Sequence, residues 1–220
     1  MPIPQDSDLS ALVAAIDPVA YARTRNDLEG AVTGLSPWIT HGLVTLPGLV
    51  TRLALAPDCT LAFQFGWREF FNHVWGKLGE GIFDNIQPGL PGVSYGDTLP
   101  ADIREGRTGV PAIDLAVATL YASGTLHNHA RLWLASYIVH LRKVRWQVAA
   151  DWLYGHLLDG DLASNHLSWQ WVAATFSRRP YLFNAANVAR FAPADWHSGG
   201  SAVDIPYAAV EQLARSPEAL

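Results

Sequence analysis

The stretch DGDLASNHLSWQW, residues 159–171, brings two carboxylates, an amide, a histidine and two indoles into thirteen positions. Such a run is too polar for an ordinary core helix and too aromatic for a solvated loop. Carboxylates and amides hydrogen-bond to polar ligands, and indoles pack against flat ring systems. These residues are therefore the first candidates for holding a large aromatic ligand.

Two arginines could act together with this stretch. Arg68 and Arg131 lie in otherwise apolar segments, while Asp159 and Asp161 end another. Charges in such surroundings are normally paired, because isolated burial of a charge is costly. Two interpretations stay open: the four residues form structural ion pairs, or they jointly grip a polar heterocycle.

The segment TGLSPW, residues 33–38, could bind a phosphate. Ser36 and Pro37 form an N-cap and first-turn pair, which predicts a helix start. Backbone N–H groups and the helix dipole at such a start attract anions. A plainly capped helix explains the same residues equally well.

Metal and nucleophile chemistry has little support. The eight histidines include HNH at 127–129, but that spacing suits a strand better than a helix, and no HExxH or cysteine pair accompanies it. Cys59 is the single cysteine and begins an apolar segment, and there is no GxSxG. The chain therefore cannot form an internal disulfide, and we predict neither a metal site nor hydrolase activity.

The composition bounds the class of protein. Of 220 residues, 50% are hydrophobic and 16% charged, so a globular domain with a sizeable core is expected. Nine tryptophans are more than core packing usually asks for, which agrees with a ligand between aromatic walls. The formal net charge of −5 disfavours a broad grip on nucleic acid but leaves room for a local basic patch.

The compartment is predicted from what the sequence lacks. The start, MPIPQDSDLS, has neither the basic nor the apolar region of a signal peptide. No apolar stretch approaches the roughly 18–20 residues of a membrane span. With a single cysteine, these features predict a cytoplasmic protein without a membrane partner.

Apolar residues recur with the helical period along most of the chain, and no segment alternates with a period of two. We therefore predict an all-α fold, a multi-helix globule. Besides the helix that starts at Ser36, helices are expected at 8–16, 46–55, 59–78, 111–124, 126–141, 148–158 and 206–215. The segment 59–78 is apolar on nearly every face, which predicts a buried helix. The Gly- and Pro-rich segment 79–110 predicts a long, functional loop.

Five motifs, in order, resemble the flavin-binding domain of the photolyase/cryptochrome family. They are Y…R-N…TGLSPW…G from Tyr21 to Gly42, WREFF at 67–71, GRTGVPAID at 106–114, LHNHAR at 126–131 and LLDGDLASNHLSWQW at 157–171. The segment RRPYLFNAANVARFAP continues the match more loosely. The resemblance implies an FAD-binding domain at 19–197, between a lead-in at 1–18 and a tail at 198–220. It leaves the family's N-terminal antenna domain without a counterpart.

The resemblance implies which residues hold FAD. They are Tyr21, Thr33, Leu35, Ser36, Arg68, Arg131, Asp159, Asp161 and Asn165. Thr33, Leu35 and Ser36 are implied to hold the pyrophosphate with Tyr21, although Val32 stands where a threonine is usual. Asn165 is implied to face flavin N5 and tune the redox state, and Arg131 to pair with Asp159 beside the ring.

The resemblance also implies an electron-transfer chain. Trp169 matches its first member, next to the flavin, and Trp146 matches the second. The alternative is that both are ordinary core aromatics. A third tryptophan, expected within 79–110, is missing, and Tyr95 is the nearest candidate.

The implied substrate pocket is mixed. Trp67, Asn128 and Trp171 match positions that receive a flipped pyrimidine dimer, which needs aromatic walls and a polar group. Gln64 stands where dimer-repair enzymes commonly have glutamate, and His129 where a phosphate-binding arginine is frequent. Arg178 and Arg179 form either a basic patch at the pocket rim or a solvated surface pair.

Three functions follow from these matches. The first is a photolyase-type carbon–carbon lyase, in which reduced FAD excited by light transfers an electron to a dimer in single- or double-stranded damaged DNA. The second, favoured by Gln64, His129 and the acidic charge, is a cryptochrome-like photoreceptor without repair activity. The third is a flavin-free scaffold. The sequence leaves an antenna or signalling partner unidentified.

Overall fold

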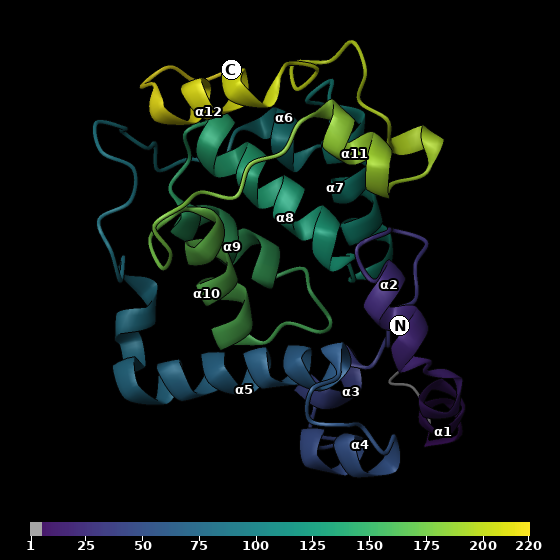
Figure 1. The fold of residues 1–220 in the computed structure, drawn as a ribbon. Coiled ribbons are helices and arrows are strands. Elements are labelled where there is room, and N and C mark those ends of the chain that lie inside the picture. The colour runs from purple at the N-terminus through teal and green to yellow at the C-terminus, as the bar shows by residue number, and fades with distance from the viewer. Residues whose placement is uncertain (1–5) are drawn as a thin grey trace.

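The computed structural model describes residues 6–220. Residues 1–5, part of the lead-in expected at 1–18, lie outside the described residues. Within the described part the chain forms helices and loops without a strand, and the prediction of an all-α fold is confirmed (Figure 1). None of the helices described combines the length and the apolarity needed to cross a membrane.

The elements follow one another with mostly short connections. They are α1 (Asp6–Ala15), α2 (Pro18–Thr24), α3 (Ser36–Thr40), α4 (Leu46–Arg52), α5 (Thr60–Leu78), η1 (Gly79–Phe83), α6 (Ala101–Arg104), α7 (Pro111–Ser123), α8 (Asn128–Ser136), η2 (Tyr137–Leu141), α9 (Trp146–Tyr154), α10 (Leu162–Val172), α11 (Ala185–Phe191), η3 (Ala194–Trp196) and α12 (Tyr207–Arg215). The five residues of η2 form a π-helical turn that continues α8. The predicted helices are thus present, with ends displaced by a few residues.

Two apolar clusters hold the fold together. The larger is built mainly from α7, α8, η2, α9 and α10, and Trp133 is its largest fully buried side chain. The smaller packs α1, α3 and α4 through residues such as Leu9, Leu35 and Leu49. In Figure 1, α5 runs beneath α9 and α10, and α12 covers the opposite end. The site described below lies where α5, α8 and α10 approach one another.

The glycine that ends α7 positions the segment that precedes α10. Pro111 is in the first turn of the helix, and Gly124 caps it with a left-handed φ of 66°. A Cβ on Gly124 would come within 2.6 Å of the Leu158 side chain. Only glycine therefore allows the backbone of Leu158 to donate its hydrogen bond to the Gly124 carbonyl, at 2.8 Å. This contact fixes the segment just before Asp159.

Two local predictions were wrong. Ser36 is the first residue of α3 and not its cap: Leu35 occupies the cap position without a side-chain hydrogen bond, and the Thr33 hydroxyl accepts from the Leu35 N–H at 3.3 Å. The helix 59–78 is not buried, since only Leu61 within α5 is. Apolar periodicity identifies α5 as a helix but does not report how many neighbours cover it.

The loop predicted at 79–110 contains only η1 and α6 as regular structure. Its middle is held by Gly96, which donates to the Lys143 carbonyl at 2.7 Å and accepts from the Arg145 N–H at 3.0 Å. This short bridge places Tyr95 beside the segment that leads directly into Trp146. The loop is therefore anchored next to the second tryptophan of the expected electron-transfer chain.

Lys143 attaches α12 to the rest of the domain. Its buried ammonium group donates to the carbonyls of Leu213, at 2.7 Å, and Ala214, at 3.0 Å, in the last turn of α12. Carbonyl groups at a helix end have no partner within the helix, so this side chain satisfies two of them. Burial lowers the pKa of Lys143 to about 8.

Lys143→Met is expected to reduce the free energy of unfolding by about 2 kcal/mol, because two carbonyl groups of α12 lose their donor while packing volume is kept. Urea unfolding followed by circular dichroism measures the change. Lys77→Met, at an exposed position in the last turn of α5, is the matched control. Equal stability of the two variants would contradict the anchoring role.

Candidate functional site

The site is centred on Asp159, whose side chain is only 8% exposed. One guanidinium nitrogen of Arg131 donates to both carboxylate oxygens, at 2.9 and 2.8 Å. The Nε of Arg131 donates to the Leu126 carbonyl at 2.7 Å, which fixes the arginine at the start of α8. The pairing of Arg131 with Asp159 that the resemblance implies is present.

A second ion pair joins three elements. Arg68 of α5 donates to Asp161 at 2.9 Å and to the Thr40 hydroxyl of α3 at 3.0 Å. The other oxygen of Asp161 accepts from the Ser164 N–H at 2.8 Å and so caps α10. Thr40 in turn donates to the Asp159 carbonyl at 3.1 Å. Both arginines therefore hold the segment before α10, as the structural interpretation requires.

One face of α10 carries a stripe of mostly polar residues that ends at Trp171. Asp161, Ser164, Ser168 and Trp171 are spaced by three, four and three residues and so lie on a single stripe. The Ser164 hydroxyl is buried without a hydrogen-bond partner among the described residues. A buried hydroxyl normally has a partner, so this atom points to a ligand on the stripe.

Asn165 lies beside this stripe and is buried. Its Nδ2 donates to the Ala150 carbonyl of α9 at 3.0 Å, which fixes the orientation of the amide. One turn later on the same side of the helix comes Trp169. The two residues that the resemblance assigns to the flavin ring are therefore neighbours.

Trp169 and Trp146 are both buried in the main core. The indole N–H of Trp146 donates to Asn85 in the 79–110 loop at 2.7 Å. His166 lies edge-on to Trp146, with 6.2 Å between ring centroids, and bonds to Asp151 through Nε2 at 3.0 Å. Burial suits both interpretations, core packing and electron transfer, because each needs close, dry aromatic contacts.

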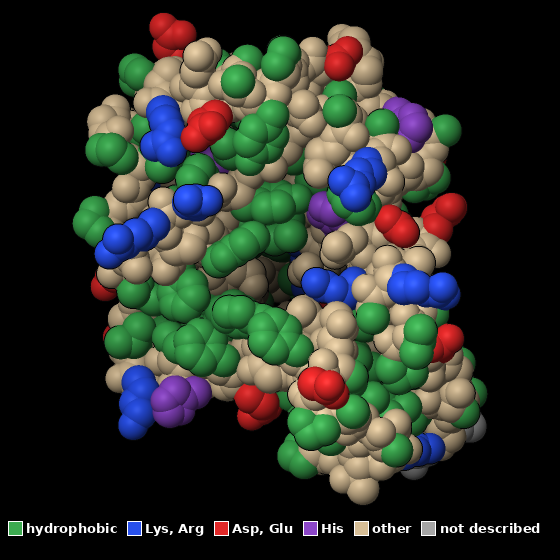
Figure 2. All heavy atoms as spheres, in the orientation of Figure 1, with side chains coloured by type: hydrophobic (Ala, Val, Ile, Leu, Met, Phe, Trp, Pro, Cys, Tyr) green, Lys and Arg blue, Asp and Glu red, His purple; other side chains and the backbone are tan. Residues whose placement is uncertain are grey.

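Two other indoles behave differently. Trp67 on α5 and Trp171 on α10 are each 40% exposed. Trp67 packs edge-on against Phe63 and Phe70, at 6.0 and 5.6 Å between centroids. Figure 2 shows hydrophobic side chains gathered around a hollow on this face, with Lys or Arg side chains beside it. Exposed aromatic surface of this extent indicates a binding surface.

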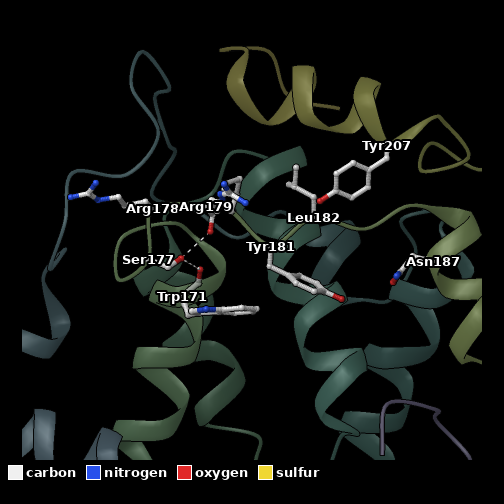
Figure 3. Close-up of a pocket in the computed structure, with 9 residues that line it drawn as sticks. Trp171, Ser177, Arg178, Arg179, Tyr181, Leu182, Asn187 and Tyr207 are labelled. Carbon is white, nitrogen blue, oxygen red and sulfur yellow. Dashed lines mark hydrogen bonds between the residues drawn. The ribbon is translucent and has the colours of Figure 1, made fainter. Parts of the chain in front are cut away.

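A cavity of about 620 Å³ adjoins Trp171 (Figure 3). Trp171 and Tyr181 form one wall, with 5.7 Å between ring centroids and 34° between planes. The exposed Arg178 and Arg179 lie at its rim, and Tyr207 of α12 also lines it. The cavity thus combines aromatic walls with positive charge.

The residues expected to hold the pyrophosphate come together only in part. Tyr21 and Thr33 line a separate cavity of about 250 Å³, and burial raises the pKa of Tyr21. The Leu35 side chain is fully buried in the smaller apolar cluster, so only its backbone could reach a ligand. Ser36 is half-buried at the start of α3, a helix of only five residues.

The remaining substrate residues lie on two helices. Gln64 is half-buried on α5, one turn before Trp67, and Asn128 is exposed as the first residue of α8. Within residues 6–220, no group of three or more His, Cys, Asp or Glu lies so that it could hold a metal ion.

His129 is engaged on both ring nitrogens and is only 7% exposed. Its Nδ1 lies 2.7 Å from the Asn26 carbonyl, and its Nε2 lies 3.0 Å from the Tyr181 hydroxyl. Sequence reasoning missed Tyr181 and Asn26 as partners of this residue. The only signal for Tyr181 was its place in the loosely matching segment 178–193.

Comparison with known proteins identifies the family. The sequence matches the family described as the FAD binding domain of DNA photolyase over residues 61–196. The chain belongs to the photolyase/cryptochrome family. Membership implies FAD, and relatives fall into both branches.

Among relatives of this photolyase/cryptochrome protein is a deoxyribodipyrimidine photo-lyase of Streptomyces griseus, 33% identical, with 70% of this chain and 35% of that protein covered. A cryptochrome DASH, chloroplastic/mitochondrial, of Oryza sativa subsp. japonica is 30% identical, with 70% and 28% covered. The chain therefore spans about a third of the length of these relatives.

Solved structures give the same fold. A cryptochrome of Synechocystis superposes with a TM-score of 0.76 at 24% identity, with 87% of this chain and 44% of that chain covered. A bacterial class III photolyase of Agrobacterium tumefaciens superposes with a TM-score of 0.74 at 25% identity, with 84% and 41% covered. The helical arrangement is thus that of the photolyase FAD-binding domain.

The residues around α10 fit the cofactor that membership implies. A flavin dinucleotide offers a flat ring, a ribose and phosphates, which need aromatic contact, acceptors and cations. The site supplies the indole of Trp169 beside Asn165, the carboxylate of Asp161, the cation of Arg68 and the unpartnered hydroxyl of Ser164. The chemistry of these residues therefore agrees with a bound FAD.

Arg131→Met is expected to lower the free energy of unfolding by about 3 kcal/mol, because it leaves the Asp159 carboxylate buried without its cation. Adding Asp159→Asn should restore most of the loss, since no charge then remains unpaired. Urea unfolding of the single and double variants measures this coupling. Arg107→Met, which breaks an exposed pair with Glu105, is the control and should change stability little.

The imidazole of His127, at the cap of α8, makes stability depend on pH. Burial, reinforced by His129 and Arg131, lowers the pKa of His127 to about 4 from its ordinary value near 6.5. Between these values the unfolded chain binds a proton that the folded chain excludes. Stability should therefore be unaffected by this group above about pH 6.5 and should fall as the pH drops toward 4.

His127→Asn keeps a residue that can cap α8 and removes the titrating ring. We expect the slope of stability against pH in this window to decrease by up to about 1.4 kcal/mol per pH unit. Urea unfolding across the window measures the slope, with His73→Asn on the exposed side of α5 as control. An unchanged slope in His127→Asn would contradict the assignment.

Proposed function

We propose that this protein binds FAD and uses light to split pyrimidine dimers in DNA, as a photolyase-type lyase. The observation that carries the proposal is the exposure of Trp67 and Trp171 beside the α10 stripe, while Trp146 and Trp169 are buried. A flipped-out pyrimidine dimer needs accessible aromatic walls, and electron donors need buried surroundings. The similarity to a deoxyribodipyrimidine photo-lyase of Streptomyces griseus also supports this activity.

In this proposal the FAD lies between α5, α8 and α10. The residues that hold it are Tyr21, Thr33, Leu35 through its backbone, Ser36, Arg68, Arg131, Asp159, Asp161 and Asn165. When bound, FAD supplies light absorption and one-electron transfer. Asn165 is suited to a fixed contact with the ring because Ala150 already holds its Nδ2.

The tryptophans Trp169 and Trp146 supply electrons in two steps. Trp169 is one turn after Asn165 on α10, and Trp146 packs edge-on against His166 of the same helix, with its N–H held by Asn85. The third donor is Tyr95, which Gly96 anchors beside residues 143–145. Burial raises the pKa of Tyr95, so this phenol keeps its proton at neutral pH.

Damaged DNA is received by Gln64, Trp67, Asn128 and Trp171. The two indoles provide stacking surface, and the two amides provide hydrogen bonds to base edges. Gln64 cannot protonate the dimer as a carboxylic acid would. Arg178 and Arg179 at the cavity rim supply charge for the phosphate backbone, and their exposure supports this role.

A second candidate function, a cryptochrome-like photoreceptor, is favoured by His129. At the position where an arginine often binds phosphate, this histidine is buried and hydrogen-bonded on both nitrogens, so it offers the DNA nothing. The formal charge of −5 acts in the same direction. Relatives of both branches are about equally similar.

A repair assay separates these functions. The protein is reconstituted with FAD, and the flavin is fully reduced. The sample is then mixed with dimer-containing single- and double-stranded oligonucleotides and exposed to blue light. We expect light-dependent loss of dimers, measured by chromatography. Trp171→Ala should weaken binding of damaged DNA by about tenfold or more, since a base loses its stacking partner. Trp75→Ala, another exposed indole of α5, is the control.

Each other outcome has a distinct meaning. Intact dimers with fully reduced flavin would reject the lyase. Reversible photoreduction together with equal affinity for damaged and undamaged DNA would establish the photoreceptor instead. Protein that is colourless and cannot be loaded with FAD would reject both.

A further inference from the structure

Tyr181 and His129 form a phenol–imidazole pair, with the imidazole buried and the phenol half-buried, that neither the cofactor nor the lesion requires. The Tyr181 hydroxyl lies 3.0 Å from Nε2 of His129, and Nδ1 of His129 lies 2.7 Å from the Asn26 carbonyl. A carbonyl oxygen only accepts, so Nδ1 carries the hydrogen. In the neutral ring Nε2 is then an acceptor, and the phenol donates to it.

The pair is held rigidly. The Tyr181 N–H donates to the Val172 carbonyl at 3.1 Å, and its carbonyl accepts from Ser136 at 2.8 Å. His129 is packed against Trp133 and Phe191, each 4.7 Å away between ring centroids. Burial lowers the pKa of His129 and raises that of Tyr181, so both rings are neutral at physiological pH.

An indole lies against the phenol. Trp171 packs on Tyr181 at 5.7 Å between centroids, with the two rings tilted by 34°, and sits on the same α10 stripe as Asp161 and Ser164 (Figure 3). A cofactor on that stripe therefore reaches Tyr181 through one indole. At the end of this path, the hydroxyl proton of Tyr181 is already hydrogen-bonded to a base, Nε2 of His129.

We propose that Tyr181 is a redox-active tyrosine that reduces the oxidised indole of Trp171 while His129 takes its phenol proton. One electron passes from the phenol to the Trp171 radical cation, which returns to a neutral indole. The O–H bond of Tyr181 breaks and an N–H bond forms at Nε2. The products are a neutral tyrosyl radical and an imidazolium ion.

Coupling the two transfers explains what the pair gains. Loss of the electron alone would leave a strongly acidic phenol radical cation, whereas transfer of the proton places the positive charge on the imidazolium of His129, whose Nδ1–H donates to the Asn26 carbonyl. The natural oxidant of Trp171 is a light-excited flavin. Only this identification of the oxidant rests on the proposed function. A small reductant such as a thiol restores Tyr181 through the open 620 Å³ cavity.

The test uses an external oxidant, so that it does not depend on FAD. The full chain is flashed with light in the presence of a ruthenium polypyridyl complex and persulfate, and tyrosyl radicals are followed by transient absorption and electron paramagnetic resonance. We expect a fast tyrosyl phase in the wild type that slows in deuterium oxide. Tyr181→Phe should abolish this phase and keep the ring contact with Trp171.

Two further variants complete the test. Tyr207→Phe removes another phenol of the same cavity and should keep the fast phase. His129→Gln keeps a hydrogen-bonding side chain but no base, and should slow the phase by about a hundredfold and remove the deuterium effect. Thermal melting by circular dichroism checks that each variant is folded.

Persistence of the fast phase in Tyr181→Phe would overturn the proposal. So would an unchanged rate in wild-type protein on transfer to deuterium oxide, a result that needs no substitution. Failure of the lyase assay with the fast phase present would reject the repair function alone. Repair activity without the fast phase would reject only the redox role of Tyr181.

Discussion

The buried carboxylate of Asp159 is the constraint on which the site depends. An ionised group that is almost wholly removed from water requires a cation at hydrogen-bond distance, and Arg131 provides it from the start of α8. Two residues later Asp161 imposes the same requirement on Arg68 of α5. Together with the Thr40 hydroxyl, the two pairs connect α3, α5, α8 and the start of α10. Gly124 has no Cβ to clash with the Leu158 side chain, so the Leu158 N–H can reach the Gly124 carbonyl.

From that arrangement follows a division among the aromatic residues. Trp146 and Trp169 point into the main core, where water is absent and contacts are close. Trp67 and Trp171 border the hollow and remain accessible. In the proposed function the same residue type thus meets two needs, electron donation in a dry interior and stacking at an open surface. Burial decides which of the two a given indole can meet.

His129 is the residue that bears most directly on the choice between the two proposed functions. Its ring nitrogens are engaged by the Asn26 carbonyl and the Tyr181 hydroxyl, and its ring packs against Trp133 and Phe191. Neutral and enclosed, it offers DNA no charge, which favours the photoreceptor over the lyase. In the proposed redox role, the same contacts make His129 the acceptor of the Tyr181 proton.

The sequence by itself determined the helical class, the order of the helices and the family, because apolar periodicity and short motifs are local properties. It also determined which charged residues need partners. Only the tertiary structure decided the exposure of α5, since coverage by neighbours is not encoded in a helix's own period. It also decided the pairing of Arg68 with Asp161 and of Tyr181 with His129, which join positions 93 and 52 residues apart. Such contacts depend on how separate helices pack, and no local pattern specifies them.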